Sequence, residues 1–259
     1  MPEMLEVETY RRLAEAALHR TIVEVDAPDP WFLKGGATAD VVVGAVLGRR
    51  FVEARRRGKL LLLDLADGPT LGIRFGMTGV LEVDGAPGEE LVYSSRRRDP
   101  AWVRFGVGFS DGGALVVRDA RRLGGVELEP DEERLGVDAA AVSRRQLSDL
   151  LVGSRAPLKA RLMDQDRMAG LGNLLTDELL WRAGIDPARP AGELSPTEVR
   201  RLHANLVRTL AVLGERGGSH TGDLQASRER GGRCPKDGAE LLRRTIGGRT
   251  TYSCPLHQR

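Results

Sequence analysis

The first residues of the chain, Met1-Pro2-Glu3, place a potential nucleophile beside a potential proton carrier. Removal of methionine before the small residue Pro2 would leave a free secondary amine. An α-amine titrates near pH ~8, roughly two units below a lysine, so a useful fraction is unprotonated at neutral pH. When such an amine attacks an aldehyde-like carbon it forms a cationic iminium, an electron sink like a lysine Schiff base. Glu3 offers a carboxylate for proton transfer. Alone, this start is also typical of proteins that make no chemical use of it.

A second candidate is Lys59, at the end of the run Arg55-Arg56-Arg57-Gly58-Lys59. The run comes directly before the apolar segment 60–65, which predicts a strand. Glycine beside lysine at the start of a strand indicates a β-turn that holds the ammonium away from the sheet. The alternative is an ordinary surface lysine on a hairpin.

A third candidate is the segment Met168-Ala169-Gly170-Leu171-Gly172-Asn173, between two helical patterns. Its two glycines allow a tight turn and a close approach to a ligand, and we expect Asn173 to cap the following helix. Amide groups at a helix start bind phosphate well. A plain helix connection is the alternative, and a dinucleotide fold is not indicated because no strand precedes the glycines.

The last candidate is a pair of short ligand motifs near the end of the chain, Cys234-Pro-Lys-Asp237 and Cys254-Pro-Leu-His257. Two such pairs are typical of a tetrahedral zinc site. A disulfide is the alternative, but metal is favoured in a cytoplasmic chain. Asp237 is the weak member of the set: it is a ligand, an outer-sphere group, or a turn residue in a site that has lost its metal.

The composition of the 259 residues is that of a globular protein, with 41% hydrophobic and 29% charged residues. An apolar run long enough to span a membrane and a secretory signal are both absent from the sequence, so we expect a cytoplasmic protein. The net charge of +2 does not indicate nucleic acid by itself. The basic residues are clustered, however, as in a protein with a basic groove, or else in separate solvated turns. The clusters are 55–57 with Lys59, 96–98, Arg228 with Arg230 and Arg233, and 243–244 with Arg249.

The elements that would position these residues form three successive parts. An amphipathic helix is predicted over 3–18, and short apolar or alternating runs then predict an antiparallel sandwich. The predicted strands are 21–25, 41–43, 60–65, 71–75, 80–83, 103–107 and 114–117, with hairpin turns at 67–69 and 110–113. After an acidic boundary at 127–133, helices are predicted over 143–151, 158–165, 174–183 and 196–213, the last capped by Ser195. We therefore predict an α+β protein with an N-terminal catalytic domain (1–130), a helical domain (131–228) and a small zinc-finger-like domain (229–259).

These motifs, in this order and spacing, resemble the formamidopyrimidine-DNA glycosylase / endonuclease VIII family. The resemblance covers essentially the whole chain, and the ordered set is specific although each motif alone is common. It is carried by Met1-Pro2-Glu3, Leu5-Glu6-Val7-Glu8, Gly58-Lys59, Gly76-Met77-Thr78-Gly79, Asp119-Ala120-Arg121-Arg122-Leu123-Gly124, Gly170-Leu171-Gly172-Asn173 and the two terminal ligand pairs.

The resemblance implies a base-excision repair enzyme that flips a damaged nucleotide out of double-stranded DNA. Pro2 would attack C1′ of the sugar and form the iminium, with proton transfers by Glu3 and help from Lys59, so that the strand breaks by β- and δ-elimination. The resemblance further implies a helix–two-turn–helix DNA-binding domain, a C-terminal β-hairpin zinc finger, Zn²⁺ as a structural cofactor, and a monomer. It assigns phosphate contacts to Lys159, Asn173 and Arg249, and assigns filling of the vacated duplex to Met77, Arg121 and Leu123.

The sequence also departs from the family pattern. Leu5 stands where a proline is usual, Leu123 replaces a phenylalanine, and Asp237 and His257 occupy the third and fourth ligand positions. The segment before Cys234, part of which folds over an everted 8-oxoguanine in the family, is reduced to 220–233. We therefore expect weak activity on 8-oxoguanine. A catalytically weakened damaged-DNA-binding relative is the alternative function, whereas RNA binding lacks an aromatic platform, since aromatic residues make up only 4%.

Overall fold

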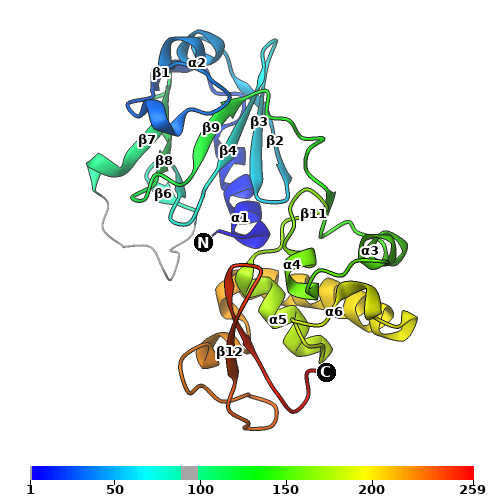
Figure 1. Cartoon of the computed structure of the whole chain (residues 1–259). Coiled ribbons are helices and arrows are strands. Elements are labelled where there is room, and N and C mark those ends of the chain that lie inside the picture. Colours follow the sequence, from blue (N-terminus) through cyan, green and yellow to red (C-terminus); the bar gives the residue numbers. More distant parts are fainter. Residues whose placement is uncertain (1, 89–98) are drawn as a thin grey trace. The chain divides into compact units, whose positions relative to one another are not determined.

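The computed structural model describes residues 2–88 and 99–259, and the basic cluster 96–98 lies outside them. The chain divides into two compact units, Met1–Glu132 and Glu133–Arg259. The predicted segment 229–259 falls within the second unit, so its status as a separate domain stays a prediction. The predicted α+β class is confirmed by antiparallel sheets in the first unit and by helices in the second (Figure 1).

The first unit is a β-sandwich with a helix at its start. One sheet has the strand order β1-β7-β8-β5-β6 and the other β2-β3-β4-β9, with antiparallel pairing throughout. The elements are α1 (Met4–Ala14), β1 (Ile22–Asp26), α2 (Ala39–Val46), β2 (Phe51–Arg57), β3 (Leu60–Leu65), β4 (Thr70–Arg74), β5 (Val80–Val83), β6 (Ala86–Pro87), β7 (Val103–Phe109), β8 (Ala114–Arg118) and β9 (Gly125–Leu128).

The core of this unit explains why the sequence folds in this way. Leu61 and Leu63 alternate along β3 and join a fully buried cluster with Val7 and Tyr10 of α1. Burying one such side chain contributes about 1.5–3 kcal/mol, so the shared burial of these side chains stabilises the packing of α1 on the sheet. The predicted hairpin turns at 67–69 and 110–113 are confirmed between β3 and β4 and between β7 and β8.

The predicted strand at 41–43 is wrong, because these residues belong to helix α2. Thr38 caps this helix, and its hydroxyl accepts a hydrogen bond from the backbone N–H of Val41. Val42 and Val46, four residues apart, are buried on one face. The helical preference of valine is only slightly unfavourable, so the cap and the burial outweigh it. Strands β2, β6 and β9 of this unit were not predicted.

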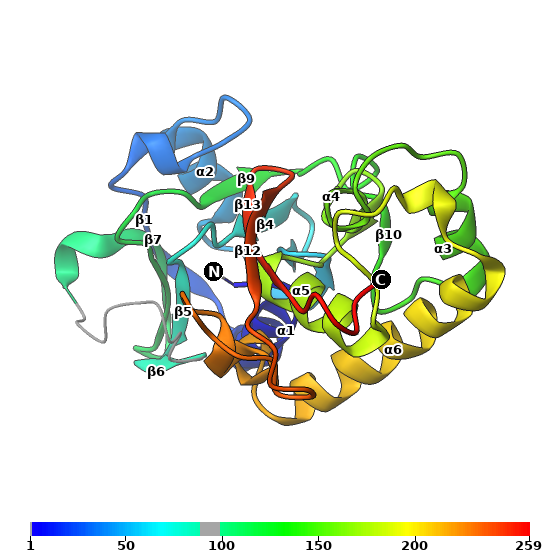
Figure 2. The same ribbon diagram turned by 60° about the horizontal axis from the view of Figure 1, so that its bottom comes forward.

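The second unit is built on four helices and a terminal β-hairpin (Figure 2). The helices are α3 (Arg144–Leu151), α4 (Leu158–Leu162), α5 (Asn173–Ala183) and α6 (Pro196–Glu215), and the hairpin joins β12 (Leu242–Ile246) to β13 (Arg249–Ser253). A short parallel pair joins β10 (Val137–Asp138) to β11 (Met168–Ala169). The predicted cap at Ser195 is confirmed, since its hydroxyl accepts a hydrogen bond from Glu198 N–H.

A membrane-spanning helix would need more length and apolar character than any helix in the described part of the chain has.

Candidate functional site

The residue that follows Pro2, Glu3, is held in place by the N-terminal cap of helix α1. Glu3 is the N-cap of α1, and its carboxylate accepts a hydrogen bond from the backbone N–H of Glu6. In return the Glu3 N–H donates to Glu6 Oε2 at 2.8 Å, which completes a capping box. The Glu3 side chain is 0% exposed. The positive end of the helix dipole favours the charged carboxylate, so an acid–base group is held in one place beside the Pro2 nitrogen.

Lys59 lies in the turn of the β2–β3 hairpin, where the sequence placed it. Gly58 adopts a left-handed φ of 58°, which a side-chain-bearing residue adopts only with strain, and Arg57 pairs with Leu60 across the turn. The preceding arginines lie on β2, and two of them form ion pairs. Arg55 contacts Asp64 at 2.6 Å, and Arg56 contacts Glu8 of α1 at 3.2 Å.

The Arg56–Glu8 ion pair connects the helix that follows Pro2 to the hairpin that carries Lys59. Arg56 also donates from Nη1 to the Gly58 carbonyl at 2.9 Å, within the turn itself. Arg11 of α1 donates to the Ala54 carbonyl of β2 at 3.4 Å. The first unit therefore holds Pro2, Glu3 and Lys59 on elements that pack directly against each other.

Met77, Arg121 and Leu123 lie on two loops of the first unit, after β4 and after β8. All three side chains are exposed, Met77 to 40% and Leu123 to 52%. An exposed methionine and an exposed leucine on neighbouring loops are suited to contact apolar surfaces such as stacked bases. The structure thus brings the three residues together on one side of the first unit.

Lys159 does not lie where a phosphate could reach its ammonium. Both Lys159 and Asp177 have side chains that are 0% exposed, and their charged groups are 2.6 Å apart. The ammonium also donates to the hydroxyl of Thr251 at 2.8 Å. The predicted direct phosphate contact therefore conflicts with this geometry, in which Lys159 joins α4 to α5 and to β13.

Asn173 is the first residue of α5 and does not cap it, so that prediction is wrong. The N-cap is Gly172, which offers no side chain. The Asn173 side-chain oxygen is buried and accepts no hydrogen bond within the described part of the chain. This oxygen can only accept a hydrogen bond, whereas the NH2 group of the same side chain and the amides of the helix start can donate to an anion.

Gln165 shapes the loop before Asn173, a role that its sequence position did not reveal. Its amide nitrogen donates to the Leu171 carbonyl at 3.0 Å, and its amide oxygen accepts from the Gly170 N–H at 3.0 Å. Gly170 has a φ of 118°, which only glycine adopts readily. The loop geometry is thus held by one side chain that reaches back from the preceding segment.

Arg249 begins β13, after a tight turn formed by Gly247 and Gly248, and it is exposed. Two other arginines from the predicted basic clusters are paired. Arg228 contacts the buried carboxylate of Asp177, and Arg244 contacts Asp186 at 2.5 Å. The hairpin therefore presents Arg249 to solvent from a strand that Lys159 ties to the helices.

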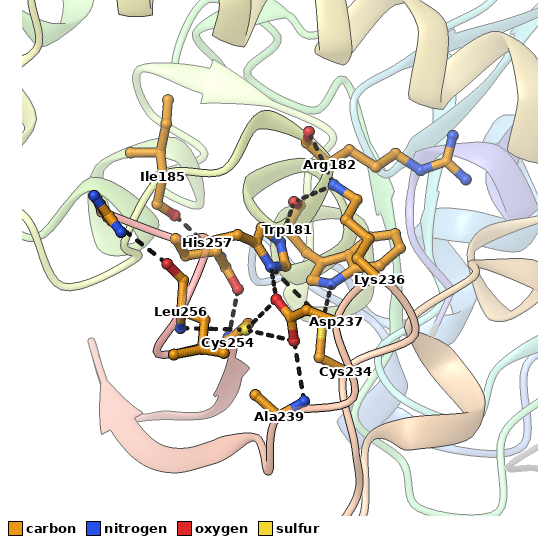
Figure 3. A network of polar contacts seen from close by, with 12 residues as sticks. Trp181, Arg182, Ile185, Cys234, Lys236, Asp237, Ala239, Cys254, Leu256 and His257 are labelled. Carbon is orange, nitrogen blue, oxygen red and sulfur yellow. Dashed lines mark hydrogen bonds and ion pairs between the residues drawn. The ribbon is translucent and has the colours of Figure 1, made fainter.

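Cys234, Asp237, Cys254 and His257 converge in one cluster, as the ligand spacing predicted (Figure 3). Their candidate ligand atoms all lie within 4.8 Å of one another. Asp237 Oδ2 is 2.8 Å from His257 Nδ1 and 3.1 Å from Cys254 Sγ. Both cysteines are free thiols, so the disulfide alternative is not realised. Two sulfurs, an imidazole nitrogen and a carboxylate oxygen form a donor set that fits tetrahedral zinc.

The polar groups around the cluster face the thiols and the imidazole. Trp181 donates from its indole N–H to Cys234 Sγ at 3.3 Å, and its carbonyl lies 3.1 Å from His257 Nε2. That contact requires the proton on Nε2, which leaves the Nδ1 lone pair directed at the cluster. Burial raises the pKa of the Cys254 thiol to about 11. The sequence did not single out Trp181, because its spacing matches an ordinary helix core.

Comparison with known proteins places both units in one family. The model of the formamidopyrimidine-DNA glycosylase N-terminal domain matches residues 1–126, and that of the H2TH domain matches residues 129–224. Formamidopyrimidine-DNA glycosylase of Thermus thermophilus is 35% identical over 282 residues, covering 100% of this chain and 98% of the relative. The corresponding protein of Chloroflexus aggregans is 33% identical over 281 residues, with the same coverage of both chains.

Solved structures agree with these relatives. The LlFpg protein, solved in a complex with THF-DNA and an inhibitor, matches with a TM-score of 0.84 at 25% identity and full coverage of both chains. MutM, solved in complex with DNA that contains carbocyclic 8-oxo-G, matches with a TM-score of 0.84 at 26% identity, again over both full chains. The fold and the site define a base-excision repair DNA glycosylase with AP lyase activity. The chain belongs to the formamidopyrimidine-DNA glycosylase family.

Proposed function

We propose that Pro2, once Met1 has been removed, is the nucleophile that attacks C1′ of a damaged nucleotide. The observation that carries this proposal is the buried Glu3 carboxylate, held by the capping box immediately behind Pro2. A nucleophilic amine needs a partner that moves protons, and this partner must be held within reach of the reacting atoms.

The reaction follows from the chemistry of a secondary amine. The Pro2 nitrogen forms a bond to C1′, the bond from C1′ to the base breaks, and the sugar ring opens to a cationic iminium. Glu3 delivers the proton that the ring oxygen needs. The iminium then acidifies the C2′ proton, and its loss expels the 3′ phosphate by β-elimination. A second elimination expels the 5′ phosphate, and water then hydrolyses the iminium, which releases the sugar fragment and restores the Pro2 amine. Lys59, held at the hairpin turn, contacts the DNA backbone and assists these proton transfers.

The partner is double-stranded damaged DNA, which this chain binds as a monomer in the cytoplasm, where the nucleoid lies. Asn173 and Arg249 contact phosphates, the first through the N–H donors of its side-chain amide and the adjoining helix start, the second from the exposed hairpin turn. Met77, Arg121 and Leu123 enter the space that the flipped nucleotide leaves. Lys159 acts indirectly, because its buried ion pair supports the strand that begins with Arg249.

A structural Zn²⁺ ion is the cofactor that the terminal cluster fits. Cys234, Asp237, Cys254 and His257 would hold the ion, which supplies a cross-link between the two ends of the terminal hairpin segment. Because β12 and β13 lie between the two ligand pairs, this cross-link fixes the turn that presents Arg249. The donor set carries two thiolates, one carboxylate and one neutral imidazole.

The lesions that suit this protein are those that need no protein cap over the base. The alignments to relatives extend over more positions than the 259 residues of this chain, so the relatives carry residues that this chain lacks. The short segment before Cys234 is fastened to α5: Glu178 accepts hydrogen bonds from the N–H groups of Asp223 at 3.0 Å and Leu224 at 2.9 Å. Leu224 is fully buried. A segment anchored in this way does not fold over a base, so ring-opened purines, oxidised pyrimidines and abasic sites are better substrates than 8-oxoguanine.

Borohydride trapping on duplex DNA with an abasic site tests the nucleophile. Reduction of the iminium should fix the protein covalently to DNA, and Pro2→Gly should reduce base excision by at least about a hundredfold. Pro69→Gly, in the turn between β3 and β4, is the matched control and should trap as wild type does. Mass spectrometry must show Pro2 as the first residue. Absence of any adduct from such protein would favour the damaged-DNA-binding alternative.

A further inference from the structure

Asp119 follows β8 and is a fully buried carboxylate whose two oxygens are occupied by four hydrogen-bond donors. Oδ1 accepts from the hydroxyl of Thr78 at 2.6 Å and from the N–H of Arg121 at 3.1 Å. Oδ2 accepts from the N–H groups of Leu123 at 2.9 Å and Gly124 at 2.8 Å. A buried carboxylate must be satisfied by such donors, because desolvation strongly disfavours an unpaired charge.

The four donors come from two different loops. Thr78 belongs to the loop between β4 and β5, whereas the three amides belong to the loop between β8 and β9. The loops also touch directly: a Cβ at Gly76 would lie 2.5 Å from the backbone carbonyl carbon of Leu123. Gly76 has a φ of 56°, so a side chain there would clash and also strain the backbone. The two loops thus form one joined structure with Asp119 as its centre.

Arg122 strengthens this arrangement from the other side of the second loop. It has a left-handed φ of 56°, which costs energy for any residue with a side chain. A bidentate ion pair with Asp29 holds Arg122 in this conformation, with Nε at 2.7 Å and Nη2 at 2.6 Å from the two carboxylate oxygens. The Arg122 guanidinium holds the pKa of Asp29 below its usual range. The side chains of the flanking residues Arg121 and Leu123 therefore project from a backbone that is held in place.

We propose that Asp119 is a positioning residue that locks the two loops into one rigid probe. In this arrangement Met77, Arg121 and Leu123 enter the duplex as a unit, and their spacing is set before DNA binds. The inference rests on the proposed function, because it assigns these exposed side chains to the space left by a flipped nucleotide. A preorganised probe loses little conformational entropy on insertion, and loosening it reduces insertion without touching the groups around Pro2.

The first test measures insertion without any chemistry. The probe is duplex DNA with 2-aminopurine opposite a tetrahydrofuran abasic analogue, which the protein binds but cannot process. Side chains that enter the helix change the stacking of the 2-aminopurine and hence its fluorescence. Wild type should give a large change on saturation, Asp119→Asn and the near-isosteric Thr78→Val should each give at most half of it, and Asp111→Asn, an exposed carboxylate in the β7–β8 turn, should match wild type.

The second test separates positioning from general damage to the fold. Asp119→Asn should lower single-turnover excision from duplex DNA by about tenfold or more, whereas borohydride trapping on single-stranded abasic DNA, which has no helix to fill, should stay within about twofold. The double variant with Thr78→Val should lose less than the product of the single losses, because both substitutions release the same contact.

The outcomes distinguish this inference from the proposed function. Equal losses on duplex and single-stranded substrates, or a wild-type fluorescence response in both variants, would overturn the role of Asp119. If Asp119→Asn is too unstable to study, Thr78→Val decides the question alone, since it leaves the carboxylate and its three backbone donors in place. Failure of wild-type protein to trap abasic DNA would overturn the role of Pro2, while the fluorescence response would still report on the loops.

Discussion

The ammonium of Lys159 lies 2.6 Å from the carboxylate of Asp177, and both side chains are completely buried. The other oxygen of Asp177 accepts a hydrogen bond from the Tyr252 N–H at 3.2 Å and contacts Arg228. Three segments far apart in the sequence therefore share one carboxylate. This ion pair connects the helices of the second unit to the hairpin that carries Arg249. Its contribution to the free energy of unfolding can be measured by substitution.

We predict that Lys159→Met lowers the free energy of unfolding by about 3 kcal/mol, because it leaves a buried carboxylate with one cationic partner fewer. Urea denaturation followed by circular dichroism would measure the loss. Lys34→Met, a lysine near the surface of the first unit, is the control and should change stability by less than about 0.5 kcal/mol. Unchanged stability together with weaker DNA binding would instead restore a direct phosphate contact for Lys159.

We predict that Trp181→Phe weakens zinc binding by about tenfold, because the indole N–H that contacts Cys234 Sγ at 3.3 Å is lost while the packing of the ring is kept. Competition with a chromophoric chelator would measure the affinity. Trp31→Phe is the matched control, since Trp31 is 67% exposed and belongs to the first unit. Equal zinc affinity in all three proteins would show that the N–H···S contact does not support the ligand.

The variant Asp237→Asn distinguishes two possible roles of Asp237, as a zinc ligand and as a turn residue. Asp237 Oδ1 accepts a hydrogen bond from the Ala239 N–H at 3.0 Å, and asparagine can keep this bond while it removes the charge. If Asp237 binds the ion, zinc affinity should fall by more than about tenfold, and the absorption of the cobalt-substituted protein should change. Glu240→Gln, an exposed neighbour, should leave both unchanged. Full zinc content and an unaltered cobalt spectrum in Asp237→Asn would show that Asp237 is a turn residue and not a ligand.

Local patterns in the sequence were sufficient for much of this architecture. The Leu60–Leu65 strand, the turn that holds Lys59 and the cap at Ser195 each depend on neighbours in the chain, and the structure has all three. The helix over 39–46 was missed because its four valines favour strands, whereas its stability comes from burial against distant residues. Propensity is a weak guide where tertiary packing decides.

The burial of Lys159 could not be read from the sequence for a related reason. Its partners, Asp177 and Thr251, lie 18 and 92 residues further along the chain. Likewise, nothing in the run 119–124 reveals that one carboxylate serves two loops, since Thr78 is 41 residues away. Motifs identify the residues that carry chemistry. The side chains that hold those residues in place come from distant parts of the chain and meet only in the folded structure.

We predict that Glu198 stabilises the second unit in a pH-dependent way. Its carboxylate contacts Arg189 at 2.5 Å and also accepts from the Ser195 N–H, and these contacts, chiefly the one with Arg189, lower its pKa from 4.5 to about 2. Because the folded pKa is below the unfolded one, the stabilisation is complete above pH 4.5 and is lost as the pH falls towards about 2. Glu198→Gln should therefore be about 1 kcal/mol less stable than wild type at pH 7, and the difference should shrink in acid. A difference independent of pH would contradict this, and Glu215→Gln, exposed near the end of α6, is the control.

The anchored segment before Cys234 leads to a prediction about lesions. Glu178 fixes Asp223 and the buried Leu224 against α5, so we expect this part of the segment not to fold over an everted 8-oxoguanine. Single-turnover excision of 8-oxoguanine paired with cytosine should be at least about tenfold slower than excision of a ring-opened purine in the same duplex, because contacts with the everted base are then fewer. Strand cleavage at an abasic site in the same sequence, which requires no base recognition, is the internal reference and should be fast. Excision of 8-oxoguanine at the rate of the ring-opened purine would show that recognition resides in groups other than a capping segment.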